Sequence, residues 1–143
     1  MPMHHALLSC RVLVVDDNPD VAEAQQMLLT ALNADARVAH SGADALRVFA
    51  DWSPTLVLMD IGMPGMDGYE VARRLRAQHA ERAFRLVAIT GWGQDEDCRR
   101  AQEAGFDQLL LKPVRAAELK TVLATTKGCS TVSRPATSDY RFP

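Results

Sequence analysis

The sequence predicts an α/β protein with a parallel sheet that helices cover on both faces. Short apolar runs of strand length alternate with segments of helical periodicity, and this unit recurs five times along the chain. Capping and turn residues separate the segments. Parallel strands need crossover connections, and right-handed crossovers place helices on both faces of a sheet. We therefore expect one doubly wound domain with five strands and five helices.

The strand–helix units follow one another from residue 11 onward. The expected strands are 11–15, 36–39, 55–59, 84–89 and 108–111. The expected helices begin after Asn18, after Ser41 and after Asp67, and two more span 94–104 and 115–124. Asn18 and Ser41 are good N-caps, Pro19 suits the first helical position, and Asp67 with Glu70 resembles a capping box. Gly105 suits the residue that follows a helix.

Length and composition indicate a single domain. The chain has 143 residues, 48% of them hydrophobic, which is enough to form a stable core without a structural metal or a disulfide framework. We expect residues 1–9 to be an N-terminal extension and 10–125 to be the domain. Residues 126–143 turn to Ser, Thr, Pro and Arg with little periodicity, which predicts a mobile tail. This tail is too short for an output module, so none is expected.

Charge and cysteine usage exclude several classes of protein. The net charge of −2 argues against binding to nucleic acid. No apolar run approaches the roughly 18 residues that would cross a bilayer, so no membrane association is expected. Cys10, Cys98 and Cys129 are an odd, widely spaced set without a CxxC pair, which predicts neither a disulfide scaffold nor a zinc site. A reducing cytoplasm fits this usage best.

Polar side chains gather where the expected strands end. Asp16 and Asp17 follow the first strand, Asp60 the third, Thr90 with Gly91 the fourth, and Lys112 with Pro113 the fifth. In an open parallel sheet the ligand site lies beyond the carboxyl ends of the strands. We therefore expect three carboxylates, a hydroxyl and an ammonium group at one rim.

Three neighbouring carboxylates repel one another unless positive charge compensates them. Lys112 and a divalent cation would supply that charge, and Mg²⁺ suits carboxylate and carbonyl oxygens while leaving room for phosphate oxygens. With the cation bound, one carboxylate stays ionised and can attack phosphorus. The rim therefore predicts a site that handles phosphate.

Several segments of the chain together resemble the receiver domain of two-component response regulators. They are VLVVDDN (12–18), LMDIGMPGMDGYE (58–70), ITG (89–91) and GFD through LKP (105–113). The likeness covers about residues 10–124 and keeps the motifs in order. It implies a flavodoxin-like fold with strand order 2-1-3-4-5.

The resemblance also implies a role for each rim residue. Asp60 would accept the phosphoryl group, and Asp16, Asp17, Asp60 and the backbone carbonyl of Gly62 would hold Mg²⁺. Thr90 would hydrogen-bond the acyl phosphate and Lys112 would pair with its oxygens. Pro113 is expected after a cis peptide bond that aims Lys112 into the site.

Two features depart from the pattern of receivers. Leu109 stands where many receivers carry an aromatic residue whose rotamer follows the threonine, so we expect a switch elsewhere, in the loop from Gly91 to Asp95. Gly62 and Trp92 stand at the positions that control the access of water to the phosphate. A glycine there would speed hydrolysis and an indole would slow it, so the net effect on hydrolysis stays open.

The resemblance implies a phosphoacceptor rather than an enzyme, with slow self-dephosphorylation at most. The donor would be a sensor histidine kinase or a histidine phosphotransfer protein. Phosphorylation would shift an equilibrium at a protein-binding face around the fourth helix, the fifth strand and the fifth helix, in a monomer or a phosphorylation-dependent dimer. The sequence names neither the kinase nor the downstream partner.

Other interpretations remain open beside this one. The chain also resembles receivers that are fused to hybrid histidine kinases. A Mg²⁺-dependent phosphatase of the haloacid dehalogenase class would need a second Asp where Gly62 stands, and a flavodoxin-type loop would not carry Asp16 and Asp17 against a phosphate. A degenerate receiver that serves only for docking is disfavoured because every acidic-site residue is present.

Overall fold

The computed structural model describes the chain outside residues 1–9, 63–66, 127–128, 130–139 and 142–143. Its strands are β1 (Arg11–Val15), β2 (Asp35–Ala39), β3 (Leu56–Asp60), β4 (Arg85–Thr90), β5 (Gln108–Leu111) and β6 (Tyr140–Arg141). The helices in the same residues are α2 (Pro19–Ala31), α3 (Gly42–Trp52), α4 (Gly68–Gln78), α5 (Asp95–Ala104) and α6 (Ala116–Thr125). The predicted alternation of strand and helix is confirmed.

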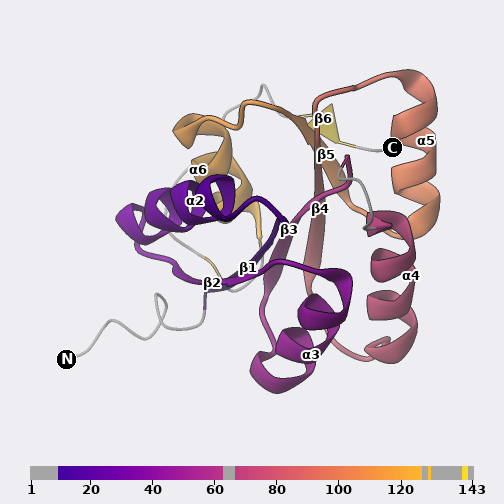
Figure 1. Ribbon diagram of the computed structural model, residues 1–143, viewed down its shortest axis with the longest axis horizontal. Coiled ribbons are helices and arrows are strands. Elements are labelled where there is room, and N and C mark those ends of the chain that lie inside the picture. Colours follow the sequence, from indigo (N-terminus) through magenta and orange to yellow (C-terminus); the bar gives the residue numbers. More distant parts are fainter. Residues whose placement is uncertain (1–9, 63–66, 127–128, 130–139, 142–143) are drawn as a thin grey trace.

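The sheet has the expected topology with one addition at its edge. β2, β1, β3, β4 and β5 lie side by side in that order and pair in parallel, which confirms the order 2-1-3-4-5. β6 then pairs antiparallel with β5, with Leu109 opposite Tyr140. Figure 1 shows α2 and α6 on one side of the sheet and α3, α4 and α5 on the other. The doubly wound arrangement therefore places every parallel strand end at one rim.

Two hydrophobic cores lie on the two faces of the sheet. Alternate residues of β1 point into different cores: Leu13 and Val15 pack with α3, α4 and α5, whereas Val12 and Val14 pack with α2 and α6. β3 is buried along its whole length. This is the pattern of a central parallel strand that is covered on both faces.

Side chains cap the N-termini of α2 and α4. Asn18 Oδ1 accepts hydrogen bonds from the backbone N–H groups of Asp20 and Val21 at 2.9 and 3.3 Å. Asp67 likewise caps α4, but Glu70 does not reach back to complete a capping box. Its carboxylate accepts instead from Arg73 and Arg74.

The expectation drawn from the cysteines is wrong in one respect. Cys10 and Cys129, 119 residues apart in sequence, form a disulfide with their Cα atoms 4.5 Å apart. Both side chains are buried in the core beneath α2 and α6. Spacing along the chain gave no sign of the bond, because the start of β1 and the segment after α6 meet only through the fold.

The mobile tail expected over 126–143 also needs correction. Cys129 is fully buried, and Tyr140–Arg141 extends the sheet as β6. Two points of this segment therefore take part in the fold. Its other residues from 127 onward, like the N-terminal extension 1–9, lie outside the described residues.

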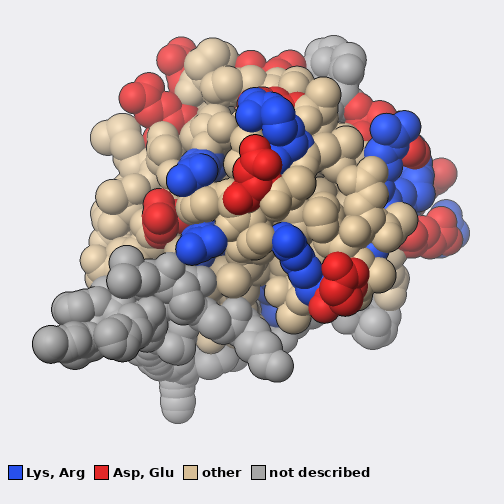
Figure 2. All heavy atoms as spheres, turned by 90° about the horizontal axis from the view of Figure 1, so that it is seen from below, with Lys and Arg blue, Asp and Glu red and all other residues tan. Residues whose placement is uncertain are grey.

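Charged side chains on one face of the molecule are mixed in sign. Figure 2 shows Lys and Arg interspersed with Asp and Glu on the face in view, several of them as neighbours. On α4, Arg73 and Arg74 both form ion pairs with Glu70. Within the described residues, none of the helices combines the length and hydropathy that a bilayer crossing requires.

Candidate functional site

The carboxyl ends of β1, β3, β4 and β5 bring the sequence-predicted polar residues to one rim. Asp60 ends β3 and Thr90 ends β4, while Asp16 and Lys112 directly follow β1 and β5. Asp16, Asp60 and Thr90 are only 3%, 2% and 3% exposed. Buried carboxylates are costly unless they are paired or hydrogen-bonded, so the partners of these groups define the chemistry of the rim.

Lys112 is the cation that faces Asp60. Its ammonium Nζ pairs with Asp60 Oδ2, and the Lys112–Pro113 peptide bond is cis. The lysine side chain is 40% exposed whereas the aspartate is buried, so the ammonium reaches from solvent into the rim. The predicted cis bond is confirmed.

The second oxygen of Asp60 is held by the backbone. Asp60 Oδ1 accepts a hydrogen bond of 2.8 Å from the N–H of Gly62. A Cβ atom on residue 62 would lie 3.6 Å from this oxygen and 4.0 Å from Thr90 Oγ1. Gly62 therefore leaves open a space that borders both the carboxylate and the hydroxyl, into which a side chain would project.

Thr90 is buried beside this space and its hydroxyl has a defined role as acceptor. Thr90 Oγ1 accepts a hydrogen bond of 3.0 Å from the N–H of Trp92. A hydroxyl can accept and donate at once, so its own hydrogen remains available to a ligand oxygen at the rim.

Asp16 is the least satisfied group at the rim. Its Oδ1 accepts from the N–H of Asn18 at 2.9 Å, while Oδ2 is buried without a hydrogen-bond partner among the described residues. Burial raises the pKa of Asp16, and the neighbouring charge of Asp60 raises it further, whereas Asn18 and Lys112 act in the opposite direction. The backbone carbonyl of Asp16 also lies 3.0 Å from Nδ1 of His40, a contact that the sequence did not predict.

The donor set fits a small, hard cation. Mg²⁺ is commonly held through one or two carboxylates and several waters, and Asp16 with its unpartnered Oδ2 beside Asp60 offers two. Asp17 follows directly but is exposed. In the described part of the chain, no group of three or more His, Cys, Asp and Glu side chains is arranged to hold a metal. The structure thus brings Asp16 and Asp60 together at the rim.

The residues expected to switch or gate the site divide into two groups. Leu109 is buried in the core beneath α3, α4 and α5, at 3% exposure, where it packs rather than points outward. Trp92 is 69% exposed, and a Cβ on Gly91 would meet no atom within 4 Å. Gly91 and Trp92 therefore border open space, whereas Gly93 in the same loop lies against Leu111 and Leu109 is packed in the core.

Sequence comparison identifies the family of this chain and several of its relatives. Residues 12–124 match the response regulator receiver domain family. The chain is 36% identical over 109 residues to the DNA-binding response regulator MtrA of Mycolicibacterium smegmatis, covering 76% of this chain and 46% of MtrA. It is 35% identical over 121 residues to the sensor protein GacS of Pseudomonas syringae, covering 82% of this chain and 13% of GacS. It thus spans less than half the length of either relative.

A solved structure shares the fold. The co-crystal structure of the Saccharomyces cerevisiae histidine phosphotransfer signaling protein Ypd1 and the receiver domain of its downstream response regulator Ssk1 contains a chain that matches with a TM-score of 0.75. The sequence identity is 24%, and the match covers 82% of this chain and 88% of that one. The chain belongs to the response regulator receiver domain family and takes the CheY-like fold.

Proposed function

We propose that this receiver accepts a phosphoryl group on Asp60 from a phosphohistidine, with Mg²⁺ bound at Asp16 and Asp60. The observation that carries the proposal is the buried Asp60 carboxylate, which faces the Lys112 ammonium on one oxygen and the Gly62 N–H on the other. A buried carboxylate held in one orientation beside a cation is suited to in-line attack on phosphorus.

In the transfer, an Asp60 oxygen forms the new bond to phosphorus while the bond from phosphorus to the histidine nitrogen breaks. The electron pair of that bond stays on the imidazole, which takes up a proton from water. The Lys112 ammonium moves from the carboxylate to the phosphoryl oxygens, and the Thr90 hydroxyl donates to one of them. Mg²⁺, when bound, supplies the charge neutralisation that two adjacent carboxylates and a phosphate require. Asp17 and the Gly62 carbonyl are further candidates to hold it.

Two features of the rim bear on how long the phosphate lasts. The absence of a side chain at Gly62 leaves space beside Asp60 Oδ1, which would favour the approach of water, and the Trp92 side chain is 69% exposed. The net effect of the two positions on hydrolysis stays open. The family resemblance implies a phosphoacceptor with slow self-dephosphorylation at most rather than a turnover enzyme.

The donor would be a sensor histidine kinase or a histidine phosphotransfer protein, as the Ypd1–Ssk1 complex illustrates for its own receiver. The match to GacS also supports a place within a hybrid kinase as an alternative to a separate regulator. The face that responds would include α5, β5 and α6 and the loop after β4, and β6 lies at its edge. A protein partner or a second copy would bind this face.

Incubation with acetyl phosphate and Mg²⁺, followed by intact mass spectrometry, tests the proposal. The wild-type chain should gain one phosphoryl group, and chelation of Mg²⁺ should abolish the gain. Asp60→Asn should gain none because its amide is a poor nucleophile. Asp51→Asn, which changes an exposed residue of α3, is the matched control and should behave as wild type. Phosphorylation of Asp60→Asn at the wild-type rate would overturn the proposal.

A further inference from the structure

The two edges of the parallel sheet are protected in different ways. β2 and β5 are the outer strands of the five that pair in parallel. An outer strand presents main-chain N–H and C=O groups with which another extended chain can pair. β2 carries Asp35 and Arg37, both exposed, and charged side chains along an edge oppose such pairing. β5, with the sequence QLLL, carries no charged side chain.

The edge of β5 is covered by the chain itself. β6 pairs antiparallel with β5, with Tyr140 opposite Leu109 and Arg141 opposite Gln108. Figure 1 shows β6 beside β5 at the outer edge of the sheet. The edge of β5 therefore accepts an antiparallel strand, and β6 gives it the protection that charged side chains give to β2.

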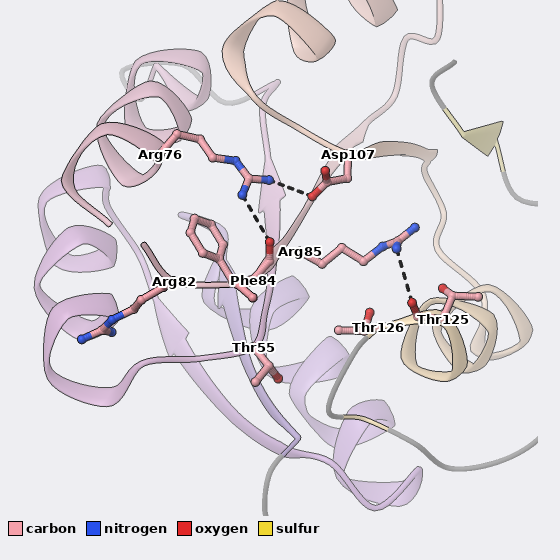
Figure 3. Close-up of a pocket in the computed structure, with 9 residues that line it drawn as sticks. Thr55, Arg76, Arg82, Phe84, Arg85, Asp107, Thr125 and Thr126 are labelled. Atoms are coloured by element: carbon pink, nitrogen blue, oxygen red, sulfur yellow. Dashed lines mark hydrogen bonds and ion pairs between the residues drawn. The ribbon is translucent and has the colours of Figure 1, made fainter. Parts of the chain in front are cut away.

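β5 is fixed to the rest of the sheet by contacts that do not involve β6. Its four residues pair with residues 87–90 of β4. Asp107, which directly precedes β5, accepts hydrogen bonds from Arg76 Nη2 at 2.7 Å and from the Leu86 N–H at 2.9 Å. Figure 3 shows Arg76 of α4 reaching toward this aspartate. Loss of β6 should therefore leave β5 in place with its outer edge uncovered.

Exposed apolar side chains lie near the carboxyl end of β5. Leu111, the last residue of the strand, is 50% exposed, and Gly93 of the loop after β4 lies against it. Trp92, next to that glycine, is also exposed. Of the large hydrophobic side chains that are exposed in the described part of the chain, only Met27 lies elsewhere, on α2. Apolar surface gathered in this way favours association with another surface.

A second copy of the same strand fits this edge. Two copies of an outer strand that are related by a two-fold axis run antiparallel, which is the direction that β6 takes on β5. Because QLLL is uncharged, no charge would face another across the new pair of strands. The half-exposed Leu111 of each copy would also lose contact with water.

Attachment to the same chain favours β6 over a second copy. Cys129 is buried and bonded to Cys10, so the segment that leads to β6 starts from a fixed point in the core. Residues 130–139 separate this point from Tyr140. A short connection holds a binding segment at an effective concentration on the order of millimolar. A second copy at micromolar concentration therefore competes poorly while β6 is intact.

We propose that β6 shields a self-pairing edge: when Tyr140–Arg141 leaves β5, the uncovered edge pairs antiparallel with β5 of a second copy and forms a dimer. The two sheets are then continuous across the two-fold axis. This edge borders the face of α5, β5 and α6, but pairing requires neither Mg²⁺ nor phosphorylation of Asp60. Dimerisation through β5 is therefore separable from the phosphoacceptor reaction.

Analytical ultracentrifugation of the full chain, without Mg²⁺ or a phosphoryl donor, tests the proposal. Proline has no main-chain N–H to give to a strand ladder, so Tyr140→Pro/Arg141→Pro should prevent β6 from pairing. The dissociation constant of the dimer should fall at least about tenfold relative to wild type, since about two main-chain hydrogen bonds of β6 no longer compete. An unchanged monomer in the variant, or equal dimerisation of the wild type, would overturn the proposal.

Two further substitutions in the double-proline chain locate the interface. Leu111→Lys places a charge on the uncovered edge and should return the chain to monomer. Met27→Lys changes an equally apolar, exposed side chain on α2 and is the matched control, which should still dimerise. Hydrogen exchange of amides in Gln108–Leu111 should slow with rising protein concentration in the dimerising chains only. A dimer that survives Leu111→Lys, or that Met27→Lys disrupts equally, would contradict pairing through β5.

Discussion

At the carboxyl end of the sheet two buried carboxylates, Asp16 and Asp60, lie near the Lys112 ammonium group, whereas at the opposite end the Arg76 guanidinium pairs with the Asp107 carboxylate. The two ends also differ in how they are held. Asp16 keeps a buried oxygen unpartnered among the described residues, while Arg76 is engaged with Asp107 and two backbone carbonyls. The carboxyl end thus keeps a buried carboxylate oxygen unpartnered, whereas at the amino end Arg76 is fixed by several acceptors.

The largest loss of stability is expected from breaking the disulfide between Cys10 and Cys129 at the amino end of the sheet. The disulfide joins residues 119 positions apart, and the chain-entropy argument gives about 5 kcal/mol for a loop of that size. Cys10→Ser should lower the free energy of unfolding by roughly that amount in urea titrations, while phosphorylation of Asp60 in the folded protein persists. Cys98→Ser, which leaves the disulfide intact, is the control.

Reducing agent should reproduce the effect of Cys10→Ser in the wild type and have no further effect on the variant. Equal stability of wild type and Cys10→Ser under oxidising conditions would show that the link does not stabilise the fold.

The next largest loss of stability is expected from removing the Lys112 ammonium group at the carboxyl end of the sheet. Lys112→Ala leaves Asp60 buried beside Asp16 without its ammonium partner, so unfolding free energy at pH 7 should fall by about 2 kcal/mol, less than for a fully buried pair because Lys112 is half-exposed. The pKa of Asp16 should rise further, because Lys112 lowers it. Lys120→Ala, on the exposed side of α6, is the matched control.

Denaturant unfolding at several pH values measures this loss. It should shrink as the pH falls and Asp16, whose pKa is raised, becomes protonated. A loss in Lys112→Ala that is no greater than in Lys120→Ala would contradict the pairing with Asp60.

A smaller effect, an increase in the free energy of unfolding, is expected when Asp16 is replaced. Because its pKa is raised, the folded protein keeps this proton to a higher pH than the unfolded chain, and the free energy of unfolding falls as pH rises from about 3.9 through the raised pKa. Asp16→Asn should therefore stabilise the Mg²⁺-free protein at pH 7, on the order of 1 kcal/mol. Thermal unfolding across pH 3.5 to 7 measures it, with Asp51→Asn as control.

The stabilisation by Asp16→Asn should vanish near pH 3.5, and it should be smaller in saturating Mg²⁺ than without the cation. A gain that is independent of pH, or one shared by Asp51→Asn, would place its cause elsewhere.

Much of the carboxyl end was predictable from sequence, because its signals are local. A strand that ends in Asp60 and one that ends in Thr90 show their boundaries in hydrophobic periodicity, and parallel topology then brings both ends to one rim. The orientation of the side chains was not predictable in the same way. The contact of His40 with the backbone carbonyl of Asp16, for example, depends on how two loops pack.

The amino end gave almost no sequence signal. Cys10 and Cys129 stand at opposite ends of the chain, and Arg76, Arg82 and Arg85 fall within ordinary helix, loop and strand positions. Only the fold brings these residues together. The pairing of Tyr140 with Leu109 was missed for a related reason, since a two-residue strand has no periodicity to detect.

The most direct test of the central claim is to locate the phosphorylated residue. After incubation with acetyl phosphate and Mg²⁺, reduction by borohydride converts an aspartyl phosphate to homoserine, and peptide sequencing by tandem mass spectrometry then shows the position. We predict homoserine at position 60 alone, and none when Mg²⁺ is chelated. Homoserine at Asp16, Asp17 or another position, with Asp60 unchanged, would contradict the account.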